Sequence, residues 1–167
     1  MAAERKTLLM DEKRQIVEKY FDMIYRLALS QTKSREYADD VVQEVFLRYI
    51  KYNRTFESEE HTKAWLLRVT INCSKNVFNT GWYKKTVPLS ESGERVTFDT
   101  HEKSDAYYAV MDLPQKYRAV IHLFYYEDMS VEEISQNLGI NPSTVKSQLS
   151  RGRKLLKEKL KGEYDFV

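Results

Sequence analysis

The segment 130–161 carries the strongest local signals in this chain of 167 residues. Ser130 and Glu133 match a capping box, in which a hydroxyl and a carboxylate each satisfy a backbone N–H group at the start of a helix. Gly139 can adopt the left-handed conformation that ends a helix. The Asn-Pro pair at 141–142 is typical of the start of the next helix. The segment therefore predicts a short helix, a tight turn and a longer helix.

The second of these helices is strongly basic. Residues 141–161 contain seven basic side chains and one acidic side chain, a net charge of +6, whereas the whole chain has a net charge of +2. Short polar side chains and arginine near the start of such a helix suit base edges in the major groove, and basic side chains further along suit phosphates. We therefore predict a DNA-binding helix-turn-helix, rather than a basic helix end that only complements the helix dipole. The predicted contacts with duplex DNA are Ser143, Thr144, Lys146, Ser147, Ser150, Arg151, Arg153 and Lys154.

Three segments of the N-terminal half have apolar residues at helical spacing, within residues 16–27, 38–49 and 66–77. Amphipathic helices with short connections must bury their apolar faces against one another, which predicts a small helical bundle. The third segment also has a polar stripe on its other side. This stripe consists of Arg68, Asn72, Lys75, Asn76 and Asn79.

The helical period fails from about residue 80 to residue 104, where glycine and proline interrupt the pattern. A stretch of this length without periodicity indicates a linker between domains. The whole chain has only five glycines and three prolines, fewer than a many-stranded fold needs. We therefore predict an all-α protein in which two small helical domains, 1–85 and 105–167, are joined by a flexible linker, 86–104.

The chain lacks the residue patterns of an enzyme. Cys73 is the single cysteine, which excludes an internal disulfide and argues against a zinc cluster, and its place on an apolar stripe indicates an inert thiol. The three histidines lack metal-binding spacing, and there is no glycine-rich phosphate loop or nucleophile elbow. We expect no catalysis, metal, cofactor or small-molecule substrate. Because no apolar run is long enough for a signal peptide or a membrane span, we expect a cytoplasmic protein.

Three stretches resemble the sigma-70 family of RNA polymerase sigma factors. They are DDVVQEVFLRYIKYNRTF at 39–56, KAWLLRVTINCSKNVFN at 63–79, and LPQKYRAVIHLFYYEDMSVEEISQNLGINPSTVKSQLSRGRKLL at 113–156. They occur in the family's order and together cover about two thirds of the chain, so the resemblance is more specific than any one motif. The length and the two-domain layout are similar to the extracytoplasmic-function (ECF) group of this family.

The resemblance implies that residues 1–85 correspond to sigma region 2 and residues 105–167 to region 4. Region 2 would bind core RNA polymerase at the β′ clamp through Asp40, Gln43, Glu44, Phe46 and Arg48. Its third helix and the following loop would bind the separated strand of the promoter −10 element through Asn72, Lys75, Asn76, Asn79, Lys84 and Lys85. Region 4 would bind the duplex −35 element and the β flap of the polymerase. An anti-sigma factor, often membrane-anchored in this group, would hold the protein inactive.

Some alternatives stay open. Trp82 and Tyr83 suit either stacking on unpaired bases or packing against the bundle. Family members often have arginine where this chain has Ile71 and Asn79, which makes the expected −10 face less basic than usual. Without the resemblance, the acids near residue 40 would be only a solvated helix face, and the chain could be a transcriptional regulator with an N-terminal sensing bundle.

Overall fold

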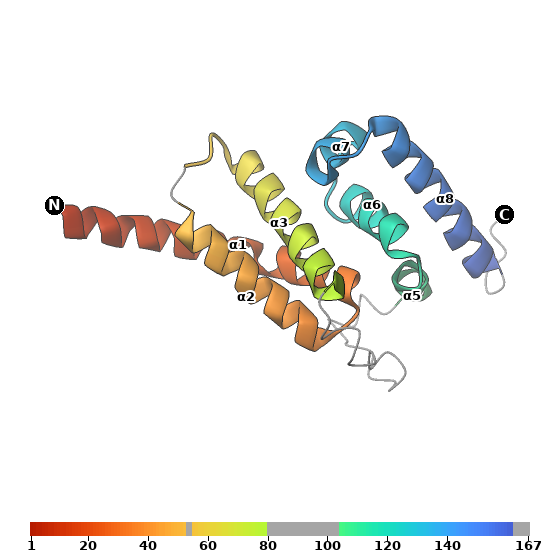
Figure 1. The fold of residues 1–167 in the computed structure, drawn as a ribbon, viewed down its shortest axis with the longest axis horizontal. Coiled ribbons are helices and arrows are strands. Elements are labelled where there is room, and N and C mark those ends of the chain that lie inside the picture. The colour runs from red at the N-terminus through yellow and green to blue at the C-terminus, as the bar shows by residue number, and fades with distance from the viewer. Residues whose placement is uncertain (53–54, 80–103, 162–167) are drawn as a thin grey trace.

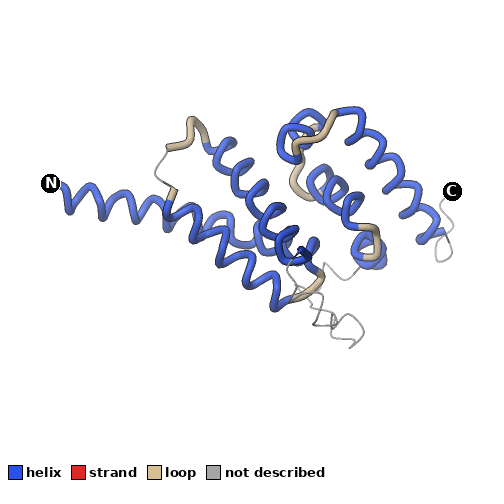
Figure 2. The backbone as a smooth tube through the Cα atoms, in the orientation of Figure 1, coloured by secondary structure: helices blue, strands red, loops and turns tan. Residues whose placement is uncertain are grey.

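The computed structural model describes residues 1–52, 55–79 and 104–161 (Figure 1). Within these ranges all regular structure is α-helical, which confirms the predicted all-α class (Figure 2). The N-terminal domain consists of α1 (Ala2–Thr32), α2 (Arg35–Lys51) and α3 (Glu59–Asn79). The C-terminal domain consists of α5 (Asp105–Met111), α6 (Gln115–Tyr125), α7 (Val131–Leu138) and α8 (Pro142–Lys161). Most of the predicted linker, residues 86–103, lies outside the described residues.

Helices α1, α2 and α3 pack on one another, as their amphipathic patterns predicted. The apolar stripes meet in a core where Ile24, Leu27 and Val45 are fully buried. Helix α1 begins well before the predicted stripe, and its N-terminal part projects beyond the bundle (Figure 1). It ends at Thr32, and the next residue, Lys33, takes the left-handed conformation with φ of 56°. Ser34 then caps α2 and sends the chain back along α1.

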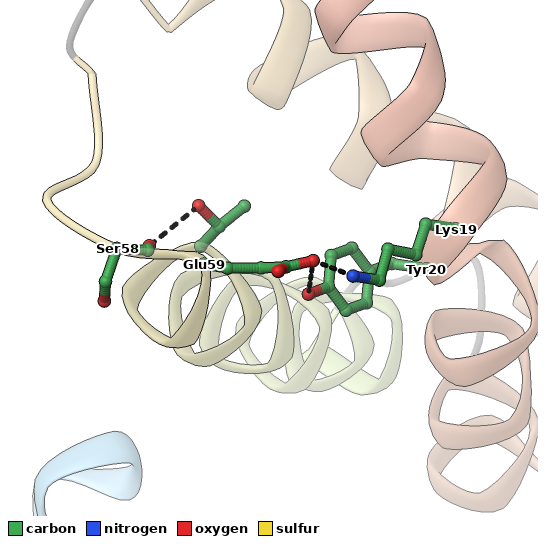
Figure 3. Close-up of polar contacts among 5 residues, drawn as sticks. Lys19, Tyr20, Ser58 and Glu59 are labelled. Atoms are coloured by element: carbon green, nitrogen blue, oxygen red, sulfur yellow. Dashed lines mark hydrogen bonds and ion pairs between the residues drawn. The ribbon is translucent and has the colours of Figure 1, made fainter.

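The start of α3 is attached to α1 by polar side chains (Figure 3). The carboxylate of Glu59 accepts hydrogen bonds from the ammonium of Lys19 and from the hydroxyl of Tyr20, the latter at 3.0 Å. Burial raises the pKa of Tyr20, so its hydroxyl keeps the proton it donates. Ser58 caps the helix, because its hydroxyl accepts the N–H of His61 at 3.2 Å. These contacts set where α3 starts and therefore which of its faces is exposed.

The C-terminal domain contains the predicted helix-turn-helix. The capping box at the start of α7 is present, with Glu133 N–H bound to Ser130 Oγ at 3.1 Å and Ser130 N–H bound to Glu133 Oε1 at 3.2 Å. Gly139 ends α7 with φ of 67°, which a side chain would strain. Helix α8 begins at Pro142. The apolar residues between α7 and α8 are buried or half-buried: Ile134, Leu138, Ile140, Val145 and Leu149.

The two domains also pack against each other, α1 against α6 and α3 against α7. Hydrogen bonds between them join Asn137 Nδ2 to Ala64 O (2.9 Å), Lys63 Nζ to Glu127 O (3.3 Å) and Arg118 Nη2 to Gln31 O (3.3 Å). Arg118 is only 4% exposed and Asn137 only 8%. Sequence reasoning did not anticipate this contact, because amphipathic spacing shows that a face is buried but not against which partner.

Candidate nucleic-acid interface

The outer face of α8 is accessible along the predicted duplex-binding residues. All eight of these side chains are exposed except Thr144, which is half-buried. The opposite face is anchored in the core by Val145, Leu149 and Gly152. A Cβ atom at Gly152 would lie 3.1 Å from Cγ1 of Ile121, so glycine lets α8 approach α6 closely. The helix therefore presents an accessible basic face on a rigid support.

The turn before α8 is held by a residue that sequence reasoning missed. The carbonyl of Ser135 accepts the N–H groups of Gly139 at 2.9 Å and Ile140 at 3.2 Å. The hydroxyl of Ser135 donates back to the carbonyl of Ile140 at 2.5 Å. These bonds fix the angle between α7 and α8. A serine one turn before a terminal glycine was a weak sequence signal for this role.

The polar stripe of α3 is exposed on the N-terminal domain. Arg68, Asn72, Lys75 and Asn76 are all exposed. Asn79 is the last residue of α3, and Lys84 and Lys85, like Trp82 and Tyr83, lie outside the described residues. Ile71, where family members often have arginine, is buried in the core at 2% exposure. Part of the less basic character of this region therefore reflects packing.

The polar face of α2 carries most of the predicted polymerase contacts. Asp40, Gln43, Glu44 and Arg48 are exposed, and Nε of Arg48 donates to Oε1 of Glu44 at 2.8 Å. Phe46 is the exception. Its side chain is 8% exposed and belongs to the core, with its ring 6.1 Å from that of Phe21, because it lies on the apolar stripe of the helix. The expectation of a surface contact by Phe46 is therefore corrected: it supports the helix from inside.

An exposed leucine lies in the middle of this polar face. Leu47 is 51% exposed, and its helical position lies between those of Gln43, Glu44 and Lys51. Sequence reasoning did not single it out, although a leucine on a polar stripe was a usable signal. An apolar centre with a charged rim is typical of protein–protein interfaces. The α2 face therefore has the composition of a docking surface.

A groove of about 370 Å³ separates the α2 face from the α3 stripe. Its walls contain residues predicted to bind polymerase and one predicted to bind the −10 strand. The lining residues are Tyr37, Asp40, Val41, Glu44, Arg48, Cys73, Asn76 and Val77. Burial raises the pKa of the Cys73 thiol, against the opposing influence of the Arg48 charge. This thiol is therefore protonated and a poor nucleophile at neutral pH.

The described part of the chain contains no cluster of metal-binding side chains. Among the same residues, no helix combines the length and apolarity that a membrane span requires.

The comparisons with known proteins agree with this geometry. Family models for sigma-70 region 2 and sigma-70 region 4 match residues 16–82 and 105–156. RNA polymerase sigma factor SigV of Bacillus subtilis is 29% identical over 145 residues, covering 83% of this chain and 85% of SigV. ECF RNA polymerase sigma factor SigM of the same species is 28% identical over 152 residues, covering 86% of this chain and 91% of SigM.

Solved structures show the same fold. The sigma factor RpoE of Bartonella quintana, solved in complex with the anti-sigma factor NepR, has a TM-score of 0.66 at 22% identity, covering 90% of this chain and 98% of that chain. Both sigma regions are thus present in order, on the helices that carry the exposed faces described above. The chain therefore belongs to the sigma-70 family, as an RNA polymerase sigma factor of the extracytoplasmic-function group.

Proposed function

We propose that this chain binds core RNA polymerase through α2, the unpaired −10 strand through α3 and the duplex −35 element through α8. The observation that carries the proposal is the pairing of an apolar-centred docking face on α2 with a separate, accessible basic face on α8. The chain itself catalyses no covalent step. Its preferential binding of strand-separated DNA shifts the promoter towards the open form.

The polymerase contact is tested by Leu47→Asp, which places a charge at the centre of the α2 face. A central interface residue commonly contributes 2 kcal/mol or more, so we expect affinity for core polymerase to fall by about 30-fold or more. Leu8→Asp is the matched control, because Leu8 is also exposed but lies on the projecting start of α1. Equal losses in the two variants, or none in Leu47→Asp, would contradict docking through α2.

The DNA contacts are tested by transcription in vitro with core polymerase on a promoter library, comparing wild type with Arg151→Ala and Asn72→Ala. Arg151→Ala should weaken dependence on the −35 sequence, at a cost of about 1–3 kcal/mol if the guanidinium contacts a base. Asn72→Ala should impair open-complex formation while closed binding survives, because unpaired bases are its proposed ligand. Equal activity of all three proteins would remove both assignments.

A gel shift without polymerase separates this proposal from a transcriptional regulator. A regulator binds its operator tightly alone. The proposed sigma factor should bind promoter DNA weakly until core enzyme is added, because the polymerase holds both domains on one DNA at high effective concentration. Tight, specific binding by the chain alone would favour the regulator.

We further propose that an anti-sigma factor holds this protein inactive by covering the α2 face. RpoE was solved with the anti-sigma factor NepR, and CnrH, which has a TM-score of 0.63 at 22% identity over 93% of this chain and 91% of its own, was solved with the cytosolic domain of CnrY. These complexes support such a partner here, and a membrane-anchored one would hold this cytoplasmic protein at the membrane. Leu47→Asp should weaken binding of both the inhibitor and the polymerase.

The packed arrangement of the domains bears on this mechanism. Helix α3 packs on α7, and α7 packs on α8. Two successive helix contacts at 8–10 Å place α3 and α8 about 20 Å apart. Elements named −10 and −35 are about 25 base pairs apart, or about 85 Å of duplex at 3.4 Å per pair. We therefore expect the domains to separate when the protein occupies both elements.

A further inference from the structure

Helix α6 ends beside the DNA-facing side of α8 in a tyrosine–arginine contact. Nε of Arg153, on α8, donates to the hydroxyl oxygen of Tyr125, the last residue of α6, at 2.6 Å. The guanidinium carbon also lies 5.4 Å from the ring centre of Phe124 and 5.6 Å from that of Tyr125. Tyr125 is nevertheless 52% exposed. Sequence reasoning assigned Arg153 to DNA and gave Tyr125 no role.

The donors left over in this contact suit an anion. With Nε bound to Tyr125, the Nη groups of Arg153 have no hydrogen-bond partner among the residues that the structure describes, and no carboxylate there pairs with the side chain. The hydroxyl of Tyr125 accepts a hydrogen bond, so its own proton stays available for donation. The rings of Phe124 and Tyr125 hold the guanidinium, which lowers the entropy cost of binding a ligand.

The position of the contact identifies the anion. Lys146, Arg153 and Lys157 follow one another by seven and four residues and so lie along one edge of α8. The central stripe of the same face runs through Ser147 and Lys154. When the centre of a recognition helix faces base edges, its flanks face the sugar-phosphate backbone that borders the groove.

We propose that Tyr125 and Arg153 form a binding site for one backbone phosphate at the edge of the −35 element. Both side chains donate to its oxygens, Arg153 through its Nη groups and Tyr125 through its hydroxyl. This inference rests on the proposed function of α8 and adds Tyr125, on another helix, as a direct DNA contact. The plainer role for the pair is to attach α8 to α6 without touching DNA.

The test uses the full chain bound to core polymerase, with DNA in which single −35 phosphates are replaced by uncharged methylphosphonates. Tyr125→Phe removes the hydroxyl and keeps the ring beneath Arg153. Tyr126→Phe is the matched control, because Tyr126 is the next residue, is 48% exposed and stacks on His122 rather than on Arg153. We expect Tyr125→Phe to weaken binding about 10- to 100-fold, the size of one hydrogen bond to a charged group. Tyr126→Phe should have no effect.

The phosphate profile separates contact from structural support. A methylphosphonate at the contacted phosphate should weaken binding of the wild type. The same replacement should have little further effect on binding of the double variant Tyr125→Phe, Arg153→Gln. Arg153→Gln alone should lower the slope of log affinity against log salt by about one, whereas Tyr125→Phe should leave that slope unchanged. If the pair is purely structural, the two substitutions will lower the melting temperature and leave the phosphate profile as in wild type. That result would overturn the inference.

The same experiment distinguishes failure of this inference from failure of the proposed function. If the wild-type holoenzyme shows no dependence on the −35 sequence, both fail. If Arg151→Ala weakens −35 binding and Tyr125→Phe does not, the function stands and the phosphate site is refuted.

Discussion

A covalent lock between the two domains should abolish promoter-dependent transcription. The double substitution Ala64→Cys, Asn137→Cys places a thiol on each of two neighbouring residues, which a 2.9 Å hydrogen bond from Asn137 Nδ2 on α7 to the backbone carbonyl of Ala64 on α3 now joins. Oxidation, or a short bis-maleimide, would then hold the domains together. The native Cys73 is the single cysteine of the chain and is buried, so it should not compete for the cross-link.

The free energy needed to separate the two domains follows from the hydrogen bonds across their interface. The neutral bond from Asn137 is worth about 1 kcal/mol, and bonds to the charged Lys63 and Arg118 about 1.5–3 kcal/mol each when nothing replaces them. Arg118 also donates to the carbonyls of Met111 and Leu113, so separating the domains leaves most of its bonds intact. A net cost of about 3 kcal/mol corresponds to a closed-to-open ratio of roughly 100. Binding to polymerase and DNA can supply this energy, but it cannot break a covalent lock.

The assay is run-off transcription with core polymerase from a promoter that carries both elements. Locked protein should give background transcript and regain wild-type activity with reductant, since about 85 Å of duplex cannot be spanned by helices about 20 Å apart. Binding to core polymerase should persist, because the α2 face stays exposed in the closed arrangement. Each single cysteine variant, which should show no redox dependence, is the control. Full activity of protein shown to be cross-linked on a non-reducing gel would refute the reasoning.

Other predictions concern stability and reactivity. Ser130→Ala removes the cap of α7 and should lower the free energy of unfolding by about 1 kcal/mol in urea titration; an unchanged midpoint would mean that the capping box contributes nothing. Lys33→Gly should raise the free energy of unfolding by about 1 kcal/mol, because glycine adopts the left-handed φ of 56° without strain. It also removes an ammonium group whose pKa is lowered by burial and then by the charge of Arg118. A lower urea midpoint would show that the lysine side chain is stabilising. Cys73 should react with a thiol reagent at pH 8 at least about ten-fold more slowly in folded than in unfolded protein. Equal labelling rates in folded and unfolded protein would refute the burial of this thiol. Burial raises the pKa of Cys73 above the ordinary 9.0, so the folded protein binds this proton more tightly than the unfolded chain does. The stability that this proton contributes should therefore be lost as pH rises past 9.0.

Local features of the chain could be read from the sequence alone because their causes lie within a few residues. The capping box at Ser130, the left-handed end at Gly139 and the start of α8 at Pro142 depend on side chains and backbone groups within one helical turn of each other. Amphipathic spacing likewise determined which faces of the helices are buried, and with them the exposed basic face of α8 and the exposed stripe of α3.

Contacts between distant residues were decided only by the tertiary structure. Which helix meets a buried face depends on shape and volume, so the domain interface through Asn137 and the contact of Phe46 with Phe21 were not visible in the sequence. Tyr125 and Arg153 are 28 residues apart and meet because Gly152 lets α8 lie close to α6. The periodicity of a helix determines its own faces, whereas the partner of each face is selected by the packing of the whole molecule.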